Sequence, residues 1–190
     1  MGKRRLGIGL VLMTLVLLLA AAWLYIRPSK ALDMHYTEIV WQDKLKQMVE
    51  IRKPELTITQ SELNQLAKKG LAEYLSYNEL PFTISGAEFQ LNGDRLLAYI
   101  NGALGPVEFG SEVEYSLVYN DGMLILEPQN VSMRHISVAP QQIGLESIQI
   151  DLSSYFPDFI KIDNIYFPGE AVTLKFSLDW LEVARYLNLI

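Results

Sequence analysis

The chain contains no cysteine. This absence excludes disulfide bonds, and it excludes a lipid anchor attached through a thiol. A fold without such cross-links has to be held together by its hydrophobic core. Half of the 190 residues are hydrophobic, so the sequence has enough apolar side chains to build one.

Basic residues are also scarce. The chain has 16 Lys and Arg against 22 Asp and Glu, and three of the basic residues are Lys3, Arg4 and Arg5, which leaves 13 (16 minus 3) in the remainder. Nucleic-acid binding depends on neutralising phosphates with Lys and Arg. We therefore expect no nucleic-acid partner.

Motifs that carry catalysis are missing as well. The sequence has no G-x-S-x-G, no H-E-x-x-H and no Walker loop, and its only histidines are His35 and His135. Each histidine falls in an expected strand, where a half-exposed structural residue is the simpler interpretation. We expect no enzyme activity, no catalytic residues, no metal site and no cofactor.

The longest uncharged run covers residues 6–26, directly after a basic tip at residues 1–5. A helix of this length reaches about 30 Å, the thickness of a hydrocarbon core, and basic flanks mark the cytoplasmic side. The pattern predicts a transmembrane anchor at 6–26, a stalk at 27–31 and an extracytoplasmic domain at 32–190. We thus expect a single-pass protein of the cell membrane with a cytoplasmic N-terminus.

A cleaved signal peptide is the alternative interpretation of the same run. Ala20, Ala21 and Ala22 satisfy an A-x-A cleavage site. The apolar residues continue through Trp23 to Ile26, however, and the run exceeds the typical apolar region of about 7 to 15 residues in a signal peptide. Retention of the segment is the favoured prediction.

The N-terminal third of the remaining chain has helical signals. Residues 32–40 fit a strand and residues 42–52 a helix. In "LTITQSELNQLAKKGLAEYL", Thr59 and Glu62 have the spacing of a capping box. Leu63, Leu66 and Leu71 then begin an apolar stripe, so a second helix is expected to start at Thr59.

From residue 81 the hydrophobic period changes from helical to two. Strands are predicted over residues 82–91, 95–103, 107–120 and 123–138, with turns at "NGD" and "NDG". Residues 144–159 fit either a helix or a strand, and the helix is favoured because the apolar set spans three turns. Strands at 159–167 and 171–180 and a short C-terminal helix follow. Helices first and strands later indicate an α+β fold with an antiparallel meander packed on one or two helices.

This order of elements resembles the YpmS family of single-pass extracytoplasmic proteins of Gram-positive bacteria. The matching stretches are the N-terminal apolar run, "LTITQSELNQL", the long two-faced strands and "FPDFIKIDNIYF". The resemblance implies a fold similar to tubular lipid-binding domains, in which a curved antiparallel sheet wraps a helix and encloses an apolar groove. It implies no assigned reaction.

The stretch "VEFGSEVEYSLVYNDG" has one apolar and one acidic face, because side chains alternate along a strand. Its apolar face, with neighbouring strands, is the candidate ligand site. Either these side chains fill an ordinary core or they line a hydrophobic groove. The candidate residues are Phe82, Ile84, Leu96, Ile100, Phe109, Val113, Tyr115, Leu117 and Tyr119.

Two functions from different classes remain open. The leading hypothesis is a membrane-anchored binding protein for a hydrophobic ligand, either a lipid or the acyl chain of a lipoprotein, without covalent chemistry. The alternative is a scaffold for a protein partner in the cell envelope, which would use a sheet edge or the acidic face of Glu108, Glu112 and Glu114. A hydrolase built on these glutamates comes third, because they have no visible partner groups.

Overall fold

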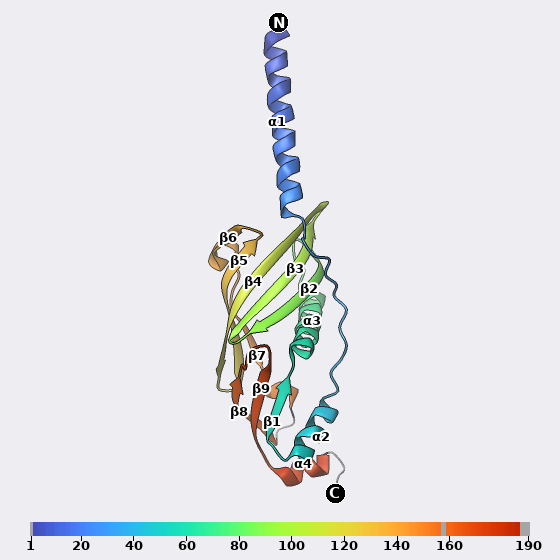
Figure 1. Ribbon diagram of the computed structural model, residues 1–190, viewed down its shortest axis with the longest axis vertical. Helices are drawn as coiled ribbons and strands as arrows, with labels where there is room; N and C mark the ends of the chain where they lie inside the picture. Colours follow the sequence, from blue (N-terminus) through green and yellow to red (C-terminus); the bar gives the residue numbers. More distant parts are fainter. Residues whose placement is uncertain (1, 157–158, 187–190) are drawn as a thin grey trace.

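The computed structural model describes residues 2–156 and 159–186. For residues 2–11 and Ala184 it describes the backbone alone. Two antiparallel sheets form an elongated body (Figure 1). The longer sheet lies next to the N-terminal helix α1 (Gly2–Ile26), which projects from one end of the body. The shorter sheet lies at the opposite end, close to the C-terminus, so the two ends of the chain are far apart.

The longer sheet is the predicted meander. Its strand order is β2-β3-β4-β5-β6, and β7 also pairs with β5. The strands are β2 (Thr83–Asn92), β3 (Arg95–Leu104), β4 (Val107–Asn120), β5 (Met123–Met133), β6 (Ile136–Val138) and β7 (Ile148–Asp151). The α+β class and the meander are therefore confirmed.

The shorter sheet has the order β1-β9-β8. It consists of β1 (Glu55–Ile58), β8 (Ile160–Tyr166) and β9 (Val172–Leu178), next to α2 (Trp41–Ile51) and α4 (Trp180–Tyr186). Strand β1 was not predicted, although Leu56 and Ile58 alternate with exposed residues as a half-buried strand requires. Phe156 joins this sheet to α2, since its ring stacks edge-on against Phe176 and Trp41, with centroids 5.1 and 5.6 Å apart.

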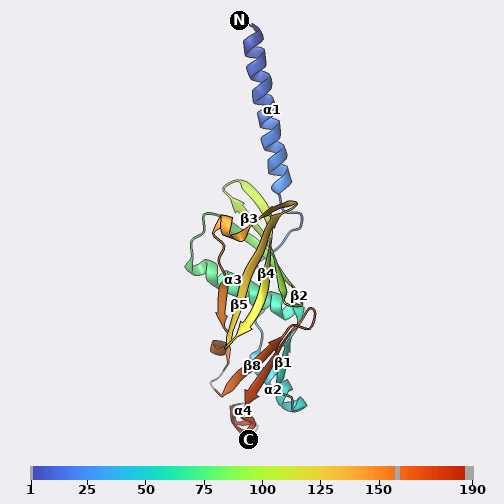
Figure 2. The ribbon, with the colours of Figure 1, turned by 90° about the vertical axis from the view of Figure 1, so that its left-hand side faces the viewer.

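Helix α3 (Gln60–Tyr77) begins with the predicted capping box. The Thr59 hydroxyl accepts a hydrogen bond from the Glu62 amide, and the Glu62 carboxylate accepts one from the Thr59 amide. The helix continues through Gly70 and lies across the longer sheet (Figure 2). Apolar side chains of α3 pack on the core of that sheet: Leu63, Leu66, Ala67 and Leu71.

Side chains of α3 also pair with the outer edge of β2. The Gln60 amide group accepts from the Leu91 N–H at 2.8 Å and donates to the Phe89 carbonyl at 2.6 Å. Asn64 Oδ1 accepts from the Phe89 N–H at 2.9 Å. These amides replace a neighbouring strand, so the edge offers no open row of backbone groups here.

Three local predictions are wrong. Residues 123–138 form two antiparallel strands, β5 and β6, and not one, because the chain turns at Arg134 and His135. Residues 32–40 form no strand; together with residues 27–31 they make an extended linker without regular secondary structure. The segment 144–159 forms no α-helix, because Ile148–Asp151 pairs with the end of β5 that β6 leaves unpaired, and a short 3-10 turn follows at Ser153–Tyr155. Residues 157–158 of this segment, residue 1 of the basic tip and the last four residues (187–190) of the predicted C-terminal helix lie outside the described residues.

The membrane prediction is also corrected. In the part of the chain that the structure describes, no helix is long and apolar enough to cross a membrane. The predicted transmembrane anchor over residues 6–26 is therefore not supported.

We expect Asn64→Leu to destabilise the protein by about 1–3 kcal/mol, because the Phe89 N–H then loses its acceptor in a part-buried place. Chemical denaturation of the two proteins measures the difference. Ser61→Ala, an exposed change in the same helix, is the matched control and should shift stability by less than about 0.5 kcal/mol. Equal stability of Asn64→Leu and the control would show that the edge contact contributes nothing.

Candidate functional site

The predicted apolar residues lie on one face of the longer sheet, called here the inner face because α3 packs on it. The structure divides them into a buried and a half-buried group. Leu96, Tyr115 and Leu117 belong to the core, with exposed fractions of 6, 8 and 7%. Burial also raises the pKa of the Tyr115 phenol. These three residues are fully packed and offer no surface to a ligand.

Tyr119 has a different role. Its hydroxyl donates a hydrogen bond of 2.9 Å to the carbonyl of Ile162 in β8. The residue therefore connects the two sheets, and we interpret it as structural.

The remaining candidates lie toward the end of the sheet near α1, and all are half-buried: Phe82, Ile84, Ile100, Phe109 and Val113. Phe82 and Phe109 pack edge-on with ring centroids 5.6 Å apart. The Phe109 ring lies directly over Gly102, where an added Cβ would be 2.6 Å from a ring carbon. This end of the inner face thus presents half-buried apolar side chains, interrupted by Ser111, which is directly opposite Ile100.

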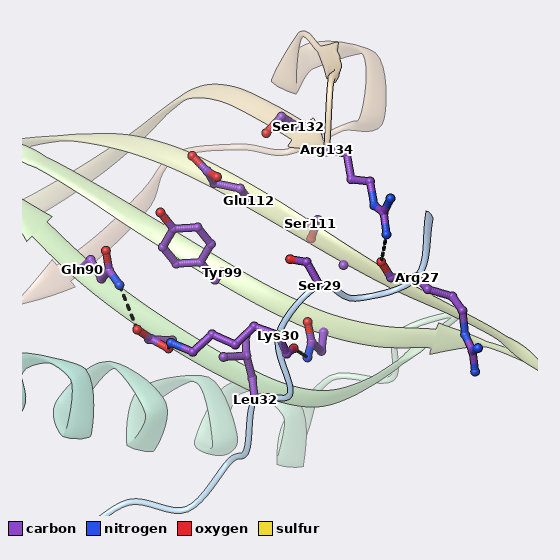
Figure 3. A pocket seen from close by; sticks show the side chains of 13 residues that line it. Arg27, Ser29, Lys30, Leu32, Gln90, Tyr99, Ser111, Glu112, Ser132 and Arg134 are labelled. Carbon is purple, nitrogen blue, oxygen red and sulfur yellow. Dashed lines mark hydrogen bonds and ion pairs between the residues drawn. The ribbon is translucent and has the colours of Figure 1, made fainter. Parts of the chain in front are cut away.

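The outer face of the same sheet carries the acidic side chains and a polar pocket of about 230 Å³ (Figure 3). One row of directly opposite residues crosses four strands and forms its floor: Glu88, Tyr99, Glu112 and Ser132. The linker forms a wall with Arg27, Ser29, Lys30 and Leu32, and Arg134 follows from the β5–β6 turn.

Two glycines allow the linker to lie this close to the sheet. A Cβ on Gly86 would be 2.2 Å from the Leu32 carbonyl oxygen, and a Cβ on Gly110 would be 3.0 Å from Pro28 Cα. Between them, the buried Asn101 side chain donates a 2.7 Å hydrogen bond to the Lys30 carbonyl. Alternation within strands does not show where a linker crosses them, so this pocket was not predicted from the sequence. Gly86 and Gly110, which interrupt the strands, are the signal that indicates such a crossing.

The linker then turns over the β2 edge at Asp33. The Asp33 carbonyl accepts from the Ala87 N–H at 3.1 Å, and its carboxylate accepts from the Lys68 ammonium at 3.0 Å. The Lys68 side chain is only 9% exposed. The hydrogen bond from Lys68, followed by that from the His35 N–H, lowers the pKa of Asp33 below its ordinary value.

Neither histidine joins a cluster. The His35 side chain is 98% exposed, and His135 lies against Tyr25 with ring centroids 6.5 Å apart. Within residues 2–156 and 159–186, no group of three or more His, Asp or Glu side chains is placed to hold a metal ion. The polar pocket and the apolar inner face are therefore the two surfaces to consider.

Docking of the linker on β2 should depend on pH. The pKa of Asp33 is lowered when the linker is docked, so the ionised carboxylate stabilises docking at every pH above its ordinary pKa of 3.8. This contribution is lost as the pH falls through the lowered pKa of the docked form. We expect the hydrogen-exchange protection factor of the Ala87 amide to drop on acidification below about pH 3.8, and to be low already at neutral pH in Asp33→Asn. The Phe89 amide, whose acceptor is the uncharged Asn64, serves as the internal control. Equal losses at both amides would mean that the sheet itself unfolds.

Similarity adds no further assignment to these surfaces. The chain matches no protein-family model, no curated protein and no solved structure. The resemblance to the YpmS family therefore stays a prediction that rests on the quoted motifs. In one of them, "LTITQSELNQL", the structure gives physical roles to Thr59, Gln60, Glu62 and Asn64, which cap α3 and cover the β2 edge.

Proposed function

We propose that the chain binds a hydrophobic ligand, a lipid or the acyl chain of a lipoprotein, on the half-buried end of the inner face. One observation carries this proposal. Along β3 the inner face changes from the buried Leu96 and Ala98 to the half-buried Ile100, while along β4 it changes from the buried Tyr115 to the half-buried Val113 and Phe109. The apolar face thus continues where its cover is incomplete.

Phe109, Ser111 and Val113 form a half-buried row along β4, and the length of this row suits a linear ligand. Val113 and Phe109 lie four residues apart on one strand, which corresponds to about 13 Å along β4. A chain of methylene groups lying over this distance would gain about 0.8 kcal/mol per buried CH₂. Binding would need no covalent step. The extracytoplasmic location expected from the sequence is a separate prediction.

The scaffold hypothesis has less support. A protein partner that adds a strand to a sheet edge could not use the β2 edge, because Gln60, Asn64 and the linker cover it. Binding of a protein partner to the acidic face has less support because Glu108 and Glu114 already form ion pairs within the chain, with Arg27 and Arg95. Reversing these charges would break the internal pairs, so it would not distinguish a partner surface from a damaged one.

The proposal is tested by filling the half-buried surface. We expect the purified full chain to carry or take up phospholipid in native mass spectrometry, and Val113→Trp to raise the dissociation constant for added phospholipid at least about tenfold, corresponding to about 1.4 kcal/mol. Val118→Trp is the matched control, because Val118 is 42% exposed on the other face of the same strand. Tyr115 is unsuitable for this test, since a larger side chain there would strain the core.

The proposal fails if the wild-type chain neither carries a lipid-sized mass nor binds added phospholipid. It also fails if the two tryptophan variants bind phospholipid as well as the wild type does. Circular dichroism of both variants separates loss of binding from loss of folding.

A further inference from the structure

The outer-face pocket contains one carboxylate, that of Glu112, for which the described part of the chain provides no basic partner. The outer face carries five glutamates, and three of them have a basic partner: Glu88 pairs with Lys30, Glu108 with Arg27 and Glu114 with Arg95. Of the other two, Glu127 is exposed and does not line the pocket. Among the described residues, Glu112 makes neither an ion pair nor a hydrogen bond, although it is half-buried and lines the pocket. The unpaired charge is therefore located where a ligand has access to it.

Three basic side chains line the pocket, and each of them has a partner other than Glu112. Lys30 extends along the floor toward Gln90 and pairs with Glu88, while the Arg27 side chain points away from Tyr99 and Glu112 (Figure 3). Arg27 also stacks on Trp23, with its guanidinium carbon 5.3 Å from the ring centroid.

Arg134 is held in the same way by the last turn of α1 and the start of the linker. Its guanidinium stacks on Tyr25 at 5.3 Å and donates a hydrogen bond of 3.3 Å to the Arg27 carbonyl. None of these three cations is placed as the counter-ion of Glu112.

The neighbours of Glu112 suit a cationic group. Tyr99 is directly opposite Glu112 in the β3–β4 pair, and the two side chains lie next to each other in the pocket. The face of a tyrosine ring attracts an ammonium group, and more strongly so when the site is partly desolvated. Burial, followed by the charges of Glu112 and Glu88, raises the pKa of Tyr99, so its ring stays neutral at physiological pH. Ser132 and Gln90 add polar groups at the margin.

We propose that this pocket binds a small ammonium compound, with Glu112 as the counter-ion and the ring of Tyr99 as an aromatic wall. The pocket of about 230 Å³ is smaller than the typical sites of about 300–1,000 Å³ for drug-sized ligands, which limits the ligand to a few heavy atoms around the cation. This site is on the opposite face of the sheet from the proposed hydrophobic surface and does not depend on it.

Choline and ethylammonium are suitable probes, and 3,3-dimethylbutan-1-ol is the uncharged carbon analogue of choline. Saturation-transfer NMR on the full chain should show saturable binding of at least one cation and none of the analogue. Glu112→Gln should weaken the binding about tenfold, as expected for loss of an interaction worth about 1.4 kcal/mol. Glu114→Gln is the matched control, since Glu114 lies on the same face of the same strand but is paired with Arg95.

Three results would overturn the proposal. They are no saturable binding of either cation, equal binding of the uncharged analogue, or equal weakening by Glu112→Gln and Glu114→Gln. The last result would indicate a general effect of the acidic face rather than a site. Because Val113 lies on the other face, Val113→Trp should leave cation binding unchanged, so a failure here and a failure of hydrophobic-ligand binding are distinguishable.

Discussion

The outer edge of β2 is the constraint on which the arrangement of the longer sheet depends. An edge strand exposes backbone N–H and C=O groups at every second residue, and burying them without partners is costly. Here the N–H groups of Ala87, Phe89 and Leu91 are paired by the linker, Asn64 and Gln60 respectively. The positions of α3 and of the linker both follow from this requirement.

The way in which α3 and the linker cover the β2 edge determines which apolar side chains become buried. The edge contacts of α3 fall at Phe89 and Leu91, and the inner-face residues beside them, Leu96 and Ala98, are buried. Toward α1 the edge partner is the linker, which contributes one backbone carbonyl and crosses to the outer face. The same linker that leaves one end of the inner face incompletely covered therefore builds the wall of the polar pocket on the other face.

Much of the fold follows from local sequence patterns. The capping box at Thr59, the alternation in β2 to β5 and the turns at "NGD" and "NDG" are strong signals, because each depends on residues close together in the chain. The strand β7 was missed because its pairing with β5 depends on where β6 ends. The apolar alternation identified the inner face, but it could not separate Leu96 from Ile100, since burial there depends on how far α3 extends over the sheet. The polar pocket was missed for a similar reason, because Lys30 and Glu112 are brought together only by the linker.

The contacts between the last turn of α1 and the sheet have a mechanical consequence. Tyr25 stacks on Arg134 at the end of β5, and Asn101 holds the Lys30 carbonyl only four residues after the helix ends at Ile26. The helix therefore contacts Arg134, and the linker that follows it contacts Asn101, and both of these residues line the outer-face pocket. A change in the tilt of α1 would move Tyr25 relative to Arg134 and with it one margin of the pocket.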